Sequence, residues 1–248
     1  MRAFSCLVFI ALAYTIEGLP ASHIVGGTDA PLGKYPYQVA LKFNSSFYYC
    51  GGSIINKRYV LTAANCLYGF YPEEITVHAG TIYLNETGDA YQPESAVWYS
   101  DDAGVDDDIA LIRLNRDIIY SDVVKPIPLA QEDIAVTDFP CVVAGWGVLQ
   151  LNGPTPNVLQ EITLKVYPHD KCKLKNSKVT DNHICTLSEE NKGLCIKDAG
   201  SALVANGVQI GIASYVGDSV GCTAEGLDVF VSVYACQDWI KEHMIDVD

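Results

Sequence analysis

The sequence predicts an all-β protein, a barrel or a sandwich, that ends in one helix. Apolar and polar residues alternate in short runs bounded by Gly, Pro, Asn or Asp, as in half-buried strands. Residues 37–43, 162–166 and 208–212 are three such runs. Many short strands between turn signals are typical of β-barrels and β-sandwiches. At residues 236–244 the apolar side chains fall at helical spacing instead, which predicts a terminal amphipathic helix.

Length and charge limit the classes of protein to consider. The chain has 248 residues, 49% of them hydrophobic and 19% charged, so it can bury one large core or two packed half-domains. Its net charge of -14 argues against a nucleic-acid partner, because a phosphate backbone would be repelled. A solvated acidic surface explains this charge, and a basic partner protein is the alternative.

The beginning of the chain has the features of a secretory signal peptide. Arg2 precedes an apolar stretch from Ala3 to Ala13 that is too short to span a bilayer. Cleavage is expected after Ala13 or near Gly18, which makes residues 1–18 a leader and residues 19–23 a short propeptide-like segment. Since no second segment approaches membrane length, we expect a secreted, extracellular protein without a membrane partner.

Removal of the leader would take Cys6 with it and leave eight cysteines, which a secreted chain uses mostly in disulfides. No cysteine spacing fits a structural zinc site, and no Gly-rich loop would cradle a phosphate, so neither a metal nor a cofactor is expected. The acidic residues 101–108 suggest calcium, but a solvated loop is the preferred interpretation. Asn44 and Asn85 begin sequons and are predicted glycosylation sites.

Six motifs in a fixed order carry a family resemblance. They are Ile24-Val25-Gly26-Gly27, Cys50-Gly51-Gly52-Ser53, Leu61-Thr62-Ala63-Ala64-Asn65-Cys66, Asp108-Ile109-Ala110-Leu111, Gly145-Trp146-Gly147 and Cys195-Ile196-Lys197-Asp198-Ala199-Gly200. Together they resemble the chymotrypsin/trypsin family of serine proteases, and details elsewhere are most similar to arthropod chymotrypsins.

The resemblance implies a fold and a domain organisation. It covers residues 24–245 and implies two packed six-stranded β-barrels with a C-terminal α-helix. The first barrel is expected at about 24–130, the second at about 131–234 and the helix at about 235–245. The cleft between the barrels would hold a Ser-His-Asp triad.

Three positions of that cleft depart from the family pattern. Asp108 matches the orienting carboxylate, but Asn65 stands where an imidazole is expected, and an amide cannot accept a proton near neutral pH. Ala199 occupies the nucleophile position without a hydroxyl, and Lys197 replaces the glycine of the oxyanion position. Because loss of the nucleophile or the base costs on the order of 10⁶ in kcat, we expect no functional catalytic residue and no enzyme activity. Ser201, paired with Lys197, is an alternative nucleophile. It lies roughly 6 to 7 Å from position 199 along an extended chain, which is too far to replace the missing hydroxyl.

The resemblance also implies an activation pair and disulfides. Asp198 would pair with the α-amino group of Ile24, yet His23 precedes the cut, where Arg or Lys is usual. We therefore expect the mature chain to begin upstream of Ile24, with a hydrogen-bonded core acid as the alternative role of Asp198. The implied disulfides are Cys50–Cys66, Cys172–Cys185 and Cys195–Cys222. Cys141 and Cys236 are left as buried thiols, a bridge outside the family pattern or a link to another chain.

The implied binding pocket has Gly193 at its floor and Ser214, Tyr215 and Val216 on the strand that pairs with a substrate backbone. Val216 should narrow the entrance, and Asp228 on a lower wall would admit a basic or polar guest. The alternative is a partly filled pocket without a ligand.

These residues predict a secreted, monomeric, non-catalytic serine protease homologue, a pseudo-chymotrypsin that acts by binding. It would be a cofactor, decoy or competitor of active serine proteases or their inhibitors, with an extracellular protease, inhibitor or protein substrate as partner. The alternatives are an acidic structural or storage glycoprotein and an endopeptidase with residual activity.

Overall fold

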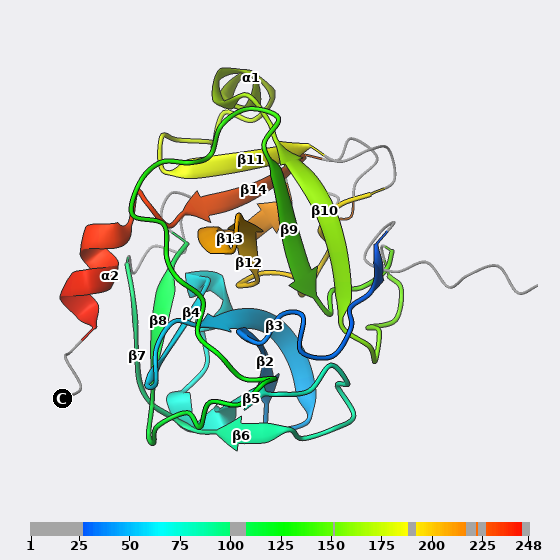
Figure 1. Cartoon of the computed structure of the whole chain (residues 1–248), viewed down its shortest axis with the longest axis vertical. Helices are drawn as coiled ribbons and strands as arrows, with labels where there is room; N and C mark the ends of the chain where they lie inside the picture. The colour runs from blue at the N-terminus through cyan, green and yellow to red at the C-terminus, as the bar shows by residue number, and fades with distance from the viewer. Residues whose placement is uncertain are drawn as a thin grey trace, which may run out of the picture.

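Two antiparallel β-sheets make up most of the molecule (Figure 1). The computed structural model describes residues 27–99, 108–150, 152–187, 192–216, 222 and 227–244. Figure 1 shows one sheet above the other, with helix α1 at the far end of the upper sheet and α2 beside the lower one. The described part of the chain contains no helix that is long and apolar enough to cross a membrane.

The first sheet has seven strands in the order β6-β5-β2-β3-β4-β8-β7. Its edge strands β6 and β7 are not paired with each other among the described residues, so this sheet is an open half-barrel. Pro93, the first residue of β7, has no N–H for a ladder with β6. The strands are β2 (Gln38–Phe43), β3 (Phe47–Ile54), β4 (Tyr59–Thr62), β5 (Ile75–Ala79), β6 (Asp89–Tyr91), β7 (Pro93–Trp98) and β8 (Ala110–Leu114).

The second sheet closes into a six-stranded barrel, because β10 pairs with both β11 and β9. The short strand β1 is added to it by pairing with β10, although β1 lies in the residue range expected for the first barrel. The strands are β1 (Thr28–Asp29), β9 (Pro140–Gly145), β10 (Gln160–Val166), β11 (His183–Leu187), β12 (Ala202–Ala205), β13 (Val208–Val216) and β14 (Leu227–Ser232). The all-β class is thus confirmed, with one closed barrel and one open sheet.

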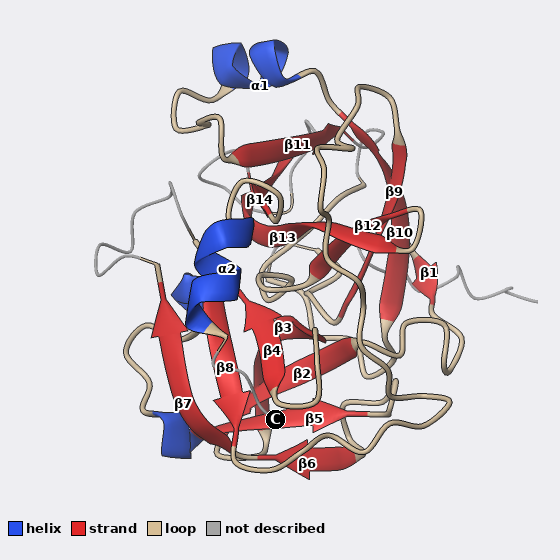
Figure 2. Ribbon diagram, turned by 60° about the vertical axis from the view of Figure 1, so that its left-hand side comes forward, coloured by secondary structure: helices blue, strands red, loops and turns tan. Residues whose placement is uncertain are grey.

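Two α-helices complete the fold, and two 3₁₀ turns, Ala64–Cys66 and Pro72–Glu74, lie in the first sheet's loops. Helix α2 (Gln237–His243) is the terminal helix that the spacing predicts. It lies beside β7 and β8 in both views (Figures 1 and 2), and its Ile240 is buried in the core of the first sheet. Helix α1 (His169–Lys175) was not predicted from the sequence. It buries only Cys172, which a disulfide joins to Cys185 of β11.

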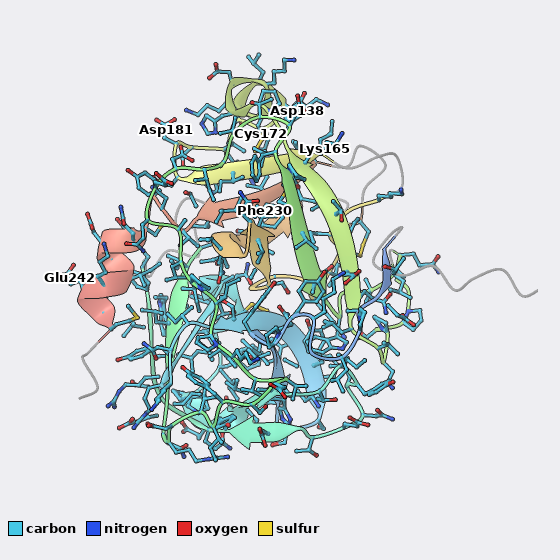
Figure 3. All side chains as sticks on the ribbon, viewed as in Figure 1. Asp138, Lys165, Cys172, Asp181, Phe230 and Glu242 are labelled. Carbon is cyan, nitrogen blue, oxygen red and sulfur yellow. A yellow bond between two sulfur atoms is a disulfide. The ribbon has the colours of Figure 1, made fainter. Side chains whose placement is uncertain are left out.

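Alternating burial explains why these residues form strands. In β10 every second residue is buried and those between are exposed or half-buried, as expected for a strand with one face on a core. Phe230, fully buried, lies within the closed barrel (Figure 3). A separate cluster joins the two sheets, where the rings of Tyr48 and Trp146 meet edge to face at 5.7 Å. This cluster fixes how the sheets meet, and the candidate site lies at that junction.

Candidate functional site

The turn at residues 195–201 lies where the two sheets meet. On one side the amide of Gly51, in β3, donates a hydrogen bond to the Ala199 carbonyl at 2.8 Å. On the other side the amide of Gly200 donates to the Ala213 carbonyl, in β13, at 2.7 Å. Gly200 has φ +81°, and a Cβ there would collide with the backbone of Gly51. Residue 199 is therefore held between the sheets from both sides.

A buried carboxylate anchors the first-sheet side of the site. Asp108 accepts hydrogen bonds from the backbone N–H of Asn65 at 2.7 Å, from Asn65 Nδ2 at 2.6 Å and from Ser214 Oγ at 2.6 Å. Burial raises the pKa of Asp108, and these donors oppose that shift. The Cys50–Cys66 disulfide holds Asn65's neighbour against β3. Asn65 and Asp108, expected in the triad region, and Ser214, expected on the substrate-pairing strand, thus come together in one network.

Position 199 presents a methyl group that is partly buried against the first-sheet core. The two nearby serines point elsewhere. Ser201 is fully buried and its Oγ accepts from Gln38 Nε2 at 3.3 Å, behind the turn, while Ser214 Oγ donates to Asp108. The structure therefore gives no support to Ser201 as a substitute nucleophile.

Lys197 adopts a backbone conformation that favours glycine, with φ +78°. Its carbonyl accepts from Tyr48 Oη at 2.9 Å. The ammonium donates to Thr155 Oγ1 at 2.9 Å and lies 4.6 Å from the centre of the Phe47 ring. Burial lowers the pKa of Lys197. Sequence reasoning missed Phe47, Tyr48 and Thr155, because no motif marks contacts between residues as far apart in the chain as 42 (Thr155) or 149 (Tyr48) positions.

Asp198 is buried, 1% exposed, beneath the same turn. Its carboxyl accepts from the amides of Gly147 at 2.8 Å and Cys195 at 3.0 Å, and burial raises its pKa to about 7. A Cβ at Gly145 or Gly147 would collide with this carboxyl, which explains the glycines of the Gly-Trp-Gly motif. Ile24, the implied partner of Asp198, lies outside the described residues. The contacts present are those of a hydrogen-bonded core acid.

Two of the expected pocket residues adjoin Leu194: Gly193 precedes it in the chain, and Asp228 is hydrogen-bonded to its amide. Asp228 of β14 is 1% exposed and accepts from the Leu194 amide at 3.2 Å, and burial raises its pKa to about 7. Gly193 is buried with φ +141°. The backbone of Val216 pairs with Asp228, whereas the side chains of Tyr215 and Val216 lie outside the described set. The basic or polar guest of Asp228 therefore stays a prediction.

Other expectations concern the rest of the chain. The three implied disulfides are formed, and Cys141 and Cys236 are buried outside them. Asn44 and Asn85 are exposed in loops, so their glycosylation stays a prediction. The leader at residues 1–18, the segment at 19–23 and the acidic residues 101–107 lie outside the described residues. In the described ranges no cluster of His, Cys, Asp and Glu could hold a metal.

Comparison with known proteins identifies close relatives of the chain. The family model for trypsin matches residues 24–240. Chymotrypsin-2 of Vespa crabro is 45% identical over 224 residues, which are 90% of this chain and 100% of the relative. Trypsin-1 of Astacus astacus is 31% identical over 238 residues, again 90% and 100% of the two chains. The vitellin-degrading protease of Bombyx mori is 29% identical over 255 residues, 96% of this chain and 95% of the relative.

Solved structures agree with these relatives. Neuropsin, a serine protease expressed in the limbic system of mouse brain, superposes with a TM-score of 0.80 at 29% identity, covering 88% of this chain and 99% of its own. Human heparin binding protein gives a TM-score of 0.79 at 27% identity, covering 91% and 98%.

The comparisons correct one expectation from the sequence. The prediction that this chain is not an enzyme is contradicted, because its 45% identity to a chymotrypsin over 90% of its length points to an active serine endopeptidase. That prediction depended on three positions, whereas the likeness extends over nearly the whole chain. Asn65, Lys197 and Ala199 are the three positions at which the chain departs from the family pattern.

Proposed function

Because the chain belongs to the trypsin family of serine proteases, we propose that it binds an extended polypeptide in the cleft between its two sheets. The observation that carries this proposal is the free edge of β13. Pairing of β12 with β13 ends at Ile212, and residues 215–216 pair only with β14 among the described strands. An extended segment can add to such an edge through main-chain hydrogen bonds.

The added segment would run along β13 and pass over residue 199. The Asp108 network supports one wall of this path, since it joins Asn65 of the first sheet to Ser214 of the second. The backbone bonds of Ala199 and Gly200 support its floor. The partner we propose is an extracellular protein, namely a protease, an inhibitor or a protein substrate. This protein would bind it as a monomer. The three disulfides are consistent with an oxidising, extracellular location.

Peptide-bond hydrolysis is the reaction that the family and its chymotrypsin relative favour. In this architecture acyl transfer uses a hydroxyl and an imidazole that face each other. Here Ala199 and Asn65 occupy those places, so cleavage and binding of the polypeptide must be tested side by side.

A second role follows from the methyl group of Ala199. Because this side chain has no hydroxyl to attack the peptide bond, a bound polypeptide would leave the site mainly by dissociation. While it is bound, other proteases cannot reach it. We therefore also propose that the chain acts as a cofactor, decoy or competitor of related proteases or their inhibitors. Both roles need the same binding site, and they differ in what happens to the bound peptide bond.

The test compares three purified proteins: the natural chain, Ala199→Phe and Leu174→Phe. The first variant places a ring on the floor of the cleft, whereas Leu174 is 87% exposed on α1, far from the junction (Figure 1). Calorimetric titration with a polypeptide chymotrypsin inhibitor and with extended peptides should give saturable binding to the natural chain and Leu174→Phe. Ala199→Phe should bind at least about tenfold more weakly.

Mass spectrometry of the same mixtures separates the two roles. Cleaved peptides support an endopeptidase, and intact bound peptides support the cofactor, decoy or competitor role. Saturable binding that Ala199→Phe leaves unchanged would place the site elsewhere. No saturable binding at all would refute the proposal and favour a structural or storage protein.

A further inference from the structure

The side chain of Lys197 lies on the β3 side of the turn at residues 195–201. Its backbone is fixed there, because Tyr48 Oη donates to the Lys197 carbonyl. From this point the ammonium reaches Thr155 Oγ1 of the second sheet's loop and the face of Phe47, the first residue of β3. Phe47 is 57% exposed, so this contact lies at the surface of the molecule.

The two sides of residue 199 define the direction of a bound polypeptide. Gly200 is bonded to β13, whose edge would receive one part of the polypeptide, and Ala199 is bonded to β3. A segment that follows the edge of β13 and passes residue 199 must therefore continue over β3. Lys197 and Phe47 lie on that side, one or two residues beyond the point where the segment crosses Ala199.

The charge of Lys197 is not neutralised within the described residues. Among these residues no carboxylate lies within ion-pair distance of the Lys197 ammonium. The ammonium contacts the Thr155 hydroxyl and the Phe47 ring. An ammonium has three donors, and Thr155 uses one of them. The other two N–H groups can donate hydrogen bonds to the carboxylate of an acidic side chain on the ligand. A basic side chain there would be repelled by the ammonium.

We propose that Lys197 is a specificity-determining residue, which selects polypeptides with Asp or Glu one or two residues beyond the position over Ala199, on the β3 side. The inference rests on the proposed function, because it names the class of polypeptide that the same cleft binds. The contacts of the Lys197 ammonium with Thr155 and the Phe47 ring hold it on the β3 side of residue 199, where it can meet such an acid. A half-buried pair of opposite charges should favour Glu over Gln by about three- to tenfold at low salt.

The test uses sets of extended peptides that are identical except for Glu, Gln or Lys at one of these two positions. Their dissociation constants are measured for the natural chain, Lys197→Met, Lys197→Arg and the control Lys165→Met. Lys165 is exposed on the outer face of β10, distant from the cleft (Figure 3). Lys197→Met removes the charge and keeps an unbranched side chain, and Lys197→Arg keeps the charge.

The natural chain, Lys197→Arg and Lys165→Met should bind in the order Glu, Gln, Lys, whereas Lys197→Met should bind all three equally. Raising the ionic strength from about 0.01 to about 0.15 M should weaken the preference. Equal binding of the three peptides to the natural chain, or a preference that survives in Lys197→Met, would overturn this inference and leave the proposed function standing. Absence of binding by every peptide would overturn both.

Discussion

The two halves of the site differ in how far they retain the hydrogen-bonding groups of the family's catalytic site. Around Asp108, the amide of Asn65 donates to the same carboxylate that an imidazole would, and Ser214 adds a third donor. At the turn of residues 195–201, the backbone frame is present, but a methyl group and a lysine occupy positions 199 and 197. A hydrogen-bond network can therefore hold its geometry through an amide, whereas a methyl group has no atom that could replace a reacting oxygen.

The strongest way to test this contrast is to restore the reacting groups. Asn65→His, Lys197→Gly and Ala199→Ser together, in a chain trimmed to begin at Ile24, should raise kcat/KM for a peptide substrate by at least about 10³-fold. Peptide hydrolysis measures the effect. The matched variant that keeps Ala199 but carries the other two changes should stay near the natural rate. No rise in the full variant would mean that the frame around the turn does not fit a substrate.

The buried acids beneath the turn predict a dependence of stability on pH. Burial raises the pKa of both Asp198 and Asp228 from 3.8 to about 7. The folded state therefore holds more protons than the unfolded state between about pH 4 and 7, and the free energy of unfolding should fall as the pH rises through this range. Urea unfolding at several pH values measures this slope.

A matched pair of variants checks the source of that slope. Asp198→Asn should reduce it by about half, because Asp228 still contributes, and Asp122→Asn, an exposed control, should leave it unchanged. Trimming the chain to Ile24 should also reduce the slope, if the new α-amino group pairs with Asp198 as the family resemblance implies. A slope that Asp198→Asn leaves intact would contradict the assignment.

Removal of the Asp108 carboxylate should destabilise the other half of the site. Asp108→Ala leaves the buried donors of Asn65 and Ser214 without their acceptor, which costs about 2 to 3 kcal/mol of unfolding free energy. Denaturant unfolding measures the loss, with Asp122→Ala as an exposed control that should change stability by less than about 0.5 kcal/mol. Equal losses in the two variants would show that the network adds nothing to the fold.

The smallest expected effect concerns the strained backbone at Lys197. Lys197→Gly should raise the unfolding free energy by up to about 1 kcal/mol, because φ +78° suits glycine better than lysine. Its neighbour Ile196, which is exposed and has no positive φ, serves as control, and Ile196→Gly should lower stability by about 0.5 to 1 kcal/mol. Destabilisation by both changes would mean that the contacts of the Lys197 ammonium outweigh the strain.

Local pattern predicted most of the fold. The alternation in residues 162–166 marks β10, and helical spacing marks α2. Helix α1 has no comparable signal, because seven mostly polar residues bury only Cys172, and its position depends on a disulfide. The pairing of β1 with the second sheet also has no signal in the local sequence. Its two exposed residues carry no pattern that selects a partner strand.

The site was predictable as far as its ordered motifs extend. These motifs contain Asn65, Asp108 and Asp198, which the structure has at the junction of the sheets together with Ser214, expected from the resemblance on the substrate-pairing strand. The direction of a side chain is not written in a motif, so neither the burial of the Ser201 hydroxyl nor the contact of Lys197 with Thr155 could be predicted. The inference about activity failed for a related reason, because a few positions were weighed against the likeness of a whole chain.

The thiol of Cys141 has a practical use. It is 3% exposed in β9, and burial raises its pKa to about 12, so a thiol reagent cannot attack it while the closed barrel is intact. The rate at which native protein is alkylated at this atom would therefore report how often β9 is transiently exposed by local opening of the second sheet.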